Sequence, residues 1–134
     1  MPVLVSATAV QLTLGLKVYL LPFYKYIRIY PEEYFGDTLK VLAGNVQDNT
    51  ISVAWNHLLK GFENASDGAN VGLHEMSHAL YFQKIIIEQN IAYRFSKKYN
   101  RLLSECRSAL EDENKGRVDL YSDYAATSLQ EFWA

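Results

Sequence analysis

The stretch "NVGLHEMSHALYF" (70–82) places His74 and His78 four residues apart, with Glu75 directly after the first histidine. On an α-helix, positions i and i+4 lie one turn apart on the same face, so both imidazoles can point at one position in space. Glu75 flanks that face. The stretch therefore predicts a helix that carries two imidazoles and a carboxylate close together.

The surrounding sequence indicates where this helix begins and ends. Asn70 is a preferred N-cap residue, and residues 71–89 follow it with a helical length. The β-branched triplet "III" (85–87) is expected to mark the end of the helix. Residues 63–70, "ENASDGAN", are expected to form the polar loop that leads into it.

Histidine, glutamate and histidine at this spacing form the pattern H-E-x-x-H, in which two imidazoles hold Zn²⁺ and the glutamate takes a proton from a water that the metal activates. The alternative is an ordinary helix with two surface histidines. Buried polar side chains are costly unless they are paired or bind a metal, which favours the zinc site. Apolar residues around the motif predict such burial: Leu73, Met76, Ala79 and Leu80.

A catalytic zinc site uses three protein ligands and leaves one position open, so a third ligand is needed. The remaining histidine, His57, lies in "WNHLLK" at an expected helix start, where a capping or surface role is more common. A histidine shortly after the motif is excluded because "ALYFQKI" (79–85) occupies that stretch. Glu131, flanked by bulky apolar residues in "QEFWA", is the best remaining candidate.

The chain of 134 residues has the length and composition of one globular domain, with 49% hydrophobic and 21% charged residues. Its net charge is −2 and no basic patch stands out, so nucleic acid is not an expected partner. The single cysteine, Cys106, cannot form an internal disulfide, so nothing points to an oxidising compartment. We expect a cytoplasmic protein; a membrane tether in a preceding segment stays open.

Residues 1–22, "MPVLVSATAVQLTLGLKVYLLP", are apolar but lack the positive n-region of a signal peptide. Polar residues interrupt them well short of the about 20 apolar residues that span a membrane. We therefore expect no membrane segment here but a buried helix. Its expected core contacts are Leu4, Ala7, Leu12 and Leu16.

The remaining patterns predict an α+β fold with a small antiparallel or mixed sheet. Three short runs are typical of strands: residues 24–31, 38–44 and 50–55. "GNVQDN" (44–49) has the composition of a turn. A brief helix and a longer amphipathic helix are expected at 56–62 and 91–110. The run "TISVAW" (50–55), just before the site, is expected at a sheet edge where an extended substrate can add as a strand.

Three blocks resemble the Mlc titration factor A family, the glucose-regulated zinc metallopeptidases of bacteria: "YPEEYF", "VAWNHLLKGFENASDGANVGLHEMSHAL" and "YAATSLQEFWA". The resemblance covers most of the chain from about residue 5 onward. The chain's ending is also similar to the catalytic portion of anthrax lethal factor, in which a tyrosine precedes a glutamate by seven residues. Tyr124 and Glu131 have that spacing here.

The resemblance implies a zincin-like metallopeptidase domain, in which a small mixed or antiparallel sheet packs on helices that include the H-E-x-x-H helix. It implies that His74, His78 and Glu131 are the zinc ligands. Glu75 is then the general base, and the hydroxyl of Tyr124 stabilises the oxyanion.

Two features depart from the family. Tyr81 stands where relatives usually have an aspartate, the kind of carboxylate that orients a ligating imidazole, so Asp119, Asp123 or a backbone carbonyl would have to substitute. Relatives also begin earlier and continue past "EFWA". We therefore expect residues 1–134 to be a single domain that is part of a longer chain.

The expected function is a zinc-dependent metallopeptidase that hydrolyses a peptide or protein substrate. The alternative is a catalytically weak or inactive zinc-binding regulatory module, because the resemblance implies binding to a transcriptional repressor of glucose metabolism and Tyr81 replaces the aspartate. A structural zinc site is disfavoured because no fourth protein ligand is in view. The substrate's sequence, endo- or aminopeptidase action and the oligomeric state stay open.

Overall fold

The structure is a computed structural model that describes residues 2–16, 19–64, 69–83, 93–114 and 131. The chain divides into two compact units, Met1–Gln83 and Lys84–Ala134. In the described residues, the first unit contains a mixed three-stranded sheet, a two-stranded sheet and three helices, and the second contains mainly one helix. The predicted α+β fold class is thereby confirmed.

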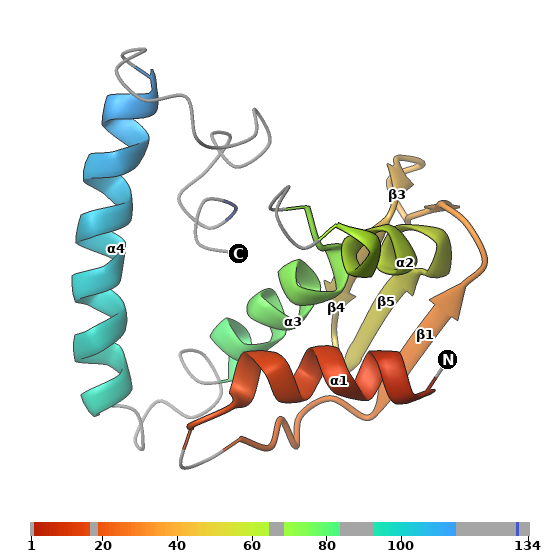
Figure 1. Cartoon of the computed structure of the whole chain (residues 1–134), viewed down its shortest axis with the longest axis horizontal. Helices are drawn as coiled ribbons and strands as arrows, with labels where there is room; N and C mark the ends of the chain where they lie inside the picture. The colour runs from red at the N-terminus through yellow and green to blue at the C-terminus, as the bar shows by residue number, and fades with distance from the viewer. Residues whose placement is uncertain (1, 17–18, 65–68, 84–92, 115–130, 132–134) are drawn as a thin grey trace. The chain divides into compact units, whose positions relative to one another are not determined.

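The first unit is built on a three-stranded sheet of order β1–β5–β4 (Figure 1). The central strand β5 (Thr50–Ala54) pairs parallel with β1 (Tyr26–Tyr30) and antiparallel with β4 (Gly44–Gln47). The predicted edge position of "TISVAW" is therefore wrong, because β5 has strand partners on both sides. The edges of this sheet are β1 and β4.

The run predicted as one strand over 38–44 is interrupted. β2 (Tyr34–Phe35) and β3 (Val41–Leu42) form a separate two-stranded hairpin, and a bend at Ala43 leads into β4. The turn predicted over 44–49 is confined to 48–49. Glycine and asparagine at the start of β4 are typical of turns, but pairing with β5 makes this segment a strand.

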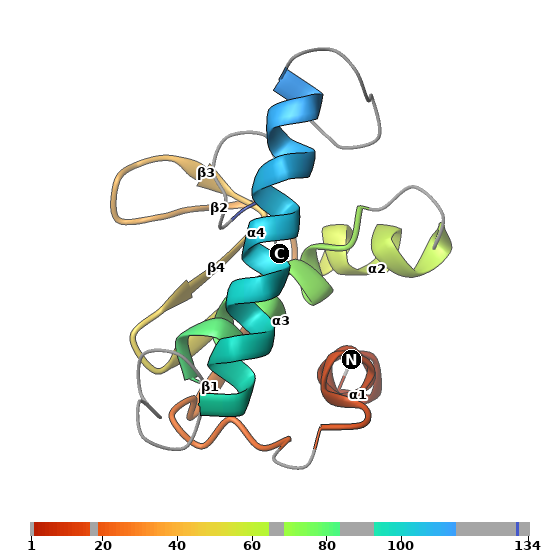
Figure 2. The same ribbon diagram turned by 90° about the vertical axis from the view of Figure 1, so that its left-hand side faces the viewer.

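Helices α1 (Pro2–Thr13), α2 (Trp55–Glu63) and α3 (Val71–Tyr81) lie on one face of the sheet (Figures 1 and 2). α3 packs against both other helices and against β4 and β5. This arrangement places the helix that carries the H-E-x-x-H motif directly over the edge strand β4. The buried core between helices and sheet consists of Ile51, Val53, Leu58, Met76 and Ala79.

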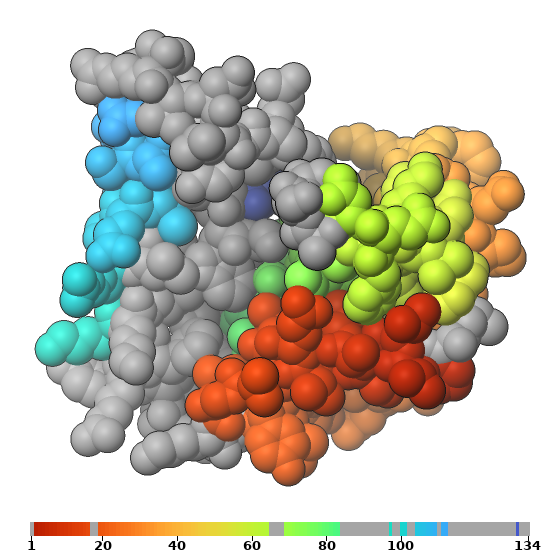
Figure 3. Space-filling view, in the orientation of Figure 1, coloured from red at the N-terminus to blue at the C-terminus, as the bar shows by residue number. Residues whose placement is uncertain are grey.

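The predicted N-terminal helix forms as α1 but is only partly buried, and it lies across the surface (Figure 3). Leu12 packs against the core, whereas the predicted core contact Ala7 is exposed. Thr8 is buried instead, and its hydroxyl donates a hydrogen bond to the carbonyl oxygen of Leu4. Because the polar residues of this helix do not gather on one side, its sequence gives little indication of the inward face. Its exposed apolar side chains include Val3 and Val10, and Leu14 directly after the helix is exposed as well.

In the second unit, α4 (Tyr93–Asn114) confirms the predicted amphipathic helix and extends it by four residues beyond 110. Arg101 and Glu105, one turn apart, form an exposed ion pair with Nε and Oε1 at 3.0 Å. Cys106 and Ala109 are half-buried. None of the helices in the described part of the chain has the length and hydropathy needed to cross a membrane.

Candidate metal centre

α3 begins at the predicted position because Asn70 caps it. Asn70 has an extended backbone, and its Oδ1 accepts a hydrogen bond from the Leu73 N–H at 3.0 Å. Its Nδ2 donates to the carbonyl oxygen of Gly61 at 3.2 Å. One side chain therefore fixes the start of α3 and ties it to the end of α2. The helix ends at Tyr81, and the triplet 85–87 lies outside the described residues.

The two histidines of the motif point their rings at each other from consecutive turns of α3. Their Nε2 atoms lie 3.1 Å apart, and the ring planes are nearly perpendicular at 87°. Two nitrogens bound to one tetrahedral Zn²⁺ at 2.0–2.1 Å lie about 3.3 Å from each other. Both imidazoles are half-buried. The arrangement of His74 and His78 therefore fits two ligands of a single tetrahedral ion.

Glu75 is buried, with 5% of its surface exposed, against the edge strand β4. A Cβ added to Gly44 would lie 2.6 Å from both Cγ and Oε1 of Glu75. Only a glycine at the start of β4 therefore leaves this room for the carboxylate. Gly44 is not among the residues predicted for the site, because the sequence around it is typical of a turn. A contact between residues 31 positions apart leaves no local signal in the sequence.

The hairpin β2–β3 lies within electrostatic reach of this carboxylate. Burial raises the pKa of the Tyr34 hydroxyl, and the negative charge of Glu75 raises it further. Tyr34 also stacks on Tyr30 at 4.0 Å between ring centroids and donates a hydrogen bond to Oδ1 of Asn45 at 3.3 Å. The hairpin is thus tied to β1 and to Asn45 of β4, the residue after Gly44.

His57 has the surface role that its position at a helix start predicts. Its Nε2 pairs with the carboxylate of Glu33, and that carboxylate also accepts a hydrogen bond from Nδ2 of Asn56 at 3.4 Å. The hydrogen bond from His57 is the main cause that lowers the pKa of Glu33 to about 2. His57 therefore holds the segment after β1 against the first turn of α2.

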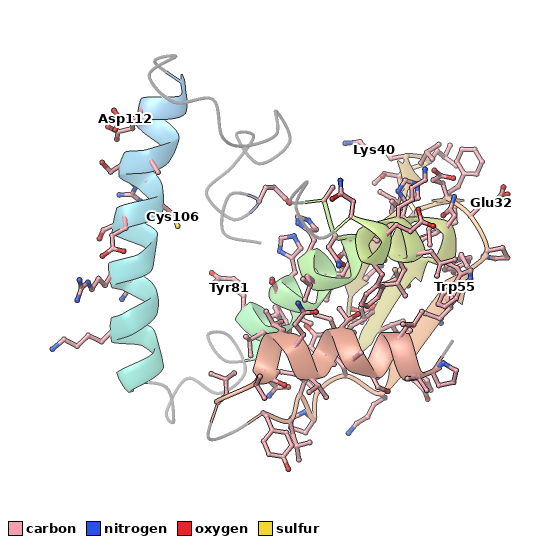
Figure 4. The ribbon with its side chains drawn as sticks, in the orientation of Figure 1. Glu32, Lys40, Trp55, Tyr81, Cys106 and Asp112 are labelled. Atoms are coloured by element: carbon pink, nitrogen blue, oxygen red, sulfur yellow. The ribbon has the colours of Figure 1, made fainter. Side chains whose placement is uncertain are left out.

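The other predicted site residues belong to different parts of the chain. Tyr81 is half-buried in the last turn of α3 (Figure 4). Glu131 is a half-buried helical residue of the second unit, and its role as a ligand stays a prediction. Tyr124, like Asp119 and Asp123, lies outside the described residues.

Searches of curated proteins and of solved structures find no match to this chain. A family model described as glucose-regulated metallo-peptidase M90 matches residues 1–134, which is the whole chain. The family implies a metallopeptidase and a metal ion, in agreement with the donor atoms on α3. The chain therefore belongs to the glucose-regulated metallopeptidase family M90, the Mlc titration factor A family.

Proposed function

We propose that this protein is a zinc-dependent peptidase with a zincin-like active site. The observation that carries the proposal is the 3.1 Å separation of the His74 and His78 Nε2 atoms on a helix whose Glu75 is buried beside them. Two imidazoles at this spacing suit zinc, which prefers nitrogen ligands in a tetrahedral arrangement. The family supplies the reaction class, hydrolysis of a peptide bond.

Glu131 is the proposed third ligand. Two histidines and one glutamate form a ligand set that is typical of catalytic zinc, and they leave a fourth position for water or substrate. The resemblance to the family supports this assignment, and the bulky apolar residues near Glu131, Leu129, Phe132 and Trp133, favour its burial. A structural site is less well supported because it would need a fourth protein ligand.

A bound zinc ion would polarise the substrate carbonyl and lower the pKa of water at the site toward 7. In the proposed mechanism, Glu75 takes a proton from the attacking water and passes it to the nitrogen of the leaving amine. The contact with Gly44 restricts where the Glu75 carboxylate can lie. Tyr124 donates a hydrogen bond to the carbonyl oxygen as negative charge develops on it.

The proposed substrate lies along β4 rather than β5. Within the described residues, the outer side of β4 has no strand partner, so its backbone groups can pair with an extended peptide. Gly44 at the start of β4 contacts Glu75, which brings this edge to the proposed general base. A peptide added there would present its backbone carbonyls to the site.

The test is to purify the protein, measure bound zinc by mass spectrometry, and assay hydrolysis of a peptide library. We expect one zinc per chain, and a loss of turnover of at least about 100-fold in Glu75→Gln with zinc retained. The matched control is Glu63→Gln, an exposed glutamate at the end of α2. Full activity of Glu75→Gln would refute the assigned base.

A second candidate is a zinc-binding regulatory module that binds a protein partner, such as a transcriptional repressor, without turnover. Tyr81 favours it, because the family aspartate that would orient an imidazole is replaced by a phenol. Stoichiometric zinc without hydrolysis of any peptide in the library would support this function over the peptidase.

A further inference from the structure

The hairpin 34–42, which contains β2 and β3, carries three exposed apolar side chains. Phe35 is 72% exposed, Leu39 81% and Val41 63%. Phe35 and Val41 are directly opposite each other in the register of the hairpin, so their side chains leave the same face. We call these three side chains the apolar hairpin face. Exposed apolar side chains gathered on one small element are typical of binding surfaces.

Leu39 occupies a conformation that leucine rarely adopts. Its φ is +57°, in the left-handed region that favours glycine and asparagine. The turn is closed by hydrogen bonds from Gly36 N to Lys40 O at 3.0 Å and from Leu39 N to Gly36 O at 2.9 Å. The chain thus holds a bulky apolar residue in a strained conformation in the turn of the hairpin, with 81% of its surface exposed. Such strain is common at functional sites.

The hairpin is fixed relative to β4, the proposed substrate edge. Tyr34 bonds to Asn45 of β4, and Nε2 of Gln47 donates to the Asp37 carboxylate at 2.8 Å. Through Ala43 the second strand of the hairpin continues directly into β4, and Figure 2 shows the hairpin standing out from the sheet at this end. The two elements therefore present one continuous surface.

The chain length between the hairpin and the site limits which substrate residues can reach it. Val41 lies three residues before Gly44, so at most about 11 Å of chain separates them. A peptide strand advances about 3.4 Å per residue. A substrate side chain up to about three positions along the strand from the residue beside Gly44 would therefore lie near the apolar hairpin face.

We propose that the apolar hairpin face binds a bulky apolar side chain of the peptide, up to about three residues from the bond that is cut. This inference rests on the proposed peptidase function and specifies its substrate class: extended peptides with phenylalanine, leucine or a similar residue at that position. The hairpin then acts as the specificity element, while α3 carries the chemistry.

The first experiment compares hydrolysis of peptides that differ only at that position, with phenylalanine, leucine, alanine or aspartate. We expect Phe35→Ser to raise KM for the phenylalanine and leucine peptides about tenfold and to leave kcat and the KM for the alanine peptide nearly unchanged. Val10→Ser is the matched control, an apolar-to-polar change on the exposed face of α1. If Phe35→Ser changed KM equally for all four peptides, or changed it for none of them, the assignment would be overturned and the peptidase function would remain intact.

The second experiment does not depend on turnover. Fluorescence anisotropy measures binding of the labelled phenylalanine and alanine peptides to zinc-loaded Glu75→Gln, with and without Phe35→Ser. The inference is supported if the phenylalanine peptide binds more tightly than the alanine peptide and if Phe35→Ser abolishes this difference. This result counts even where the wild type hydrolyses neither peptide. Equal binding of both peptides, or Phe35-dependent binding to phosphatidylcholine–phosphatidylglycerol vesicles instead of peptides, overturns it.

Discussion

At the scale of single residues, Gly44 determines how much room the Glu75 carboxylate has. In Gly44→Ala the new methyl group would lie 2.6 Å from Cγ and Oε1, and the flexible end of the glutamate would move away. We expect kcat to fall at least about tenfold, because a misplaced catalytic group loses its alignment with the reacting atoms. Bound zinc and the melting temperature should stay nearly unchanged. An unaltered kcat would show that the carboxylate does not need this position.

Tyr81 gives a second prediction for a single residue. It lies three residues after His78, so on α3 both side chains lie on the same side of the helix. A carboxylate at this position would accept a hydrogen bond from a ligating imidazole. We expect Tyr81→Asp to tighten zinc binding about tenfold in a chelator competition titration. Tyr81→Phe, the control, should leave the affinity unchanged; equal affinity in all three proteins would show that residue 81 does not orient a ligand.

At the scale of elements, the position of α3 depends on a cap that also contacts α2. Asn70→Ala removes the hydrogen bond to Leu73 N and the one to Gly61 O. We expect a loss of about 1–2 kcal/mol in the free energy of unfolding, measured by urea denaturation. Asn70→Asp keeps the acceptor for Leu73 but loses the donor to Gly61, so its loss should be smaller. Equal losses in both variants would assign the whole effect to the α2 contact.

The pair between Glu33 and His57 joins the end of β1 to α2 and predicts a pH dependence. The pKa of Glu33 is lowered to about 2, mainly by the hydrogen bond with His57. A carboxyl group whose pKa is lower in the folded than in the unfolded state stabilises the fold at any pH above the unfolded-state pKa. This stabilisation is lost as the pH falls from the unfolded-state pKa to the folded-state pKa. The difference in melting temperature between wild type and Glu33→Gln should therefore shrink between about pH 4.5 and pH 2. Because the pair is exposed, we expect a small difference, and a difference that grows with acid would contradict the assignment.

Local sequence signals predicted those elements whose type depends on their own residues. Asn70 marked the start of α3, and short runs typical of strands marked β1 and β5. Local signals gave wrong or incomplete predictions where a contact between residues far apart in the sequence determines the structure. Gly44 looks like a turn residue until the proximity of Glu75 is known, and the threonines buried in α1 satisfy their hydroxyls within the helix, so no hydrophobic pattern reveals its inward face.

Across the whole molecule, the prediction of the candidate site depends on two kinds of sequence information: the local helical repeat and the identity of a residue far away along the chain. The helical repeat alone brings His74 and His78 together, because both lie on one helix at i and i+4. The third ligand cannot follow from any repeat, because Glu131 is more than fifty residues away along the chain. Elimination of other ligands and the apolar neighbours of Glu131 made it a candidate, and the resemblance to the family implies the same residue. The family match over the whole chain adds support for a metal site without assigning the ligands.

If Glu131 is the third ligand, zinc should bind the native chain more tightly than a variant without this carboxylate, and should stabilise it more. At a free zinc concentration 100 times the dissociation constant, binding adds about 2.7 kcal/mol to the free energy of unfolding. We expect zinc to raise the melting temperature of wild type and of the control Glu105→Ala, an exposed glutamate on α4, equally. In Glu131→Ala most of this increase should disappear at the same zinc concentration. An equal increase in all three proteins would show that the metal is held without Glu131, and the third ligand would then have to be sought elsewhere in the chain.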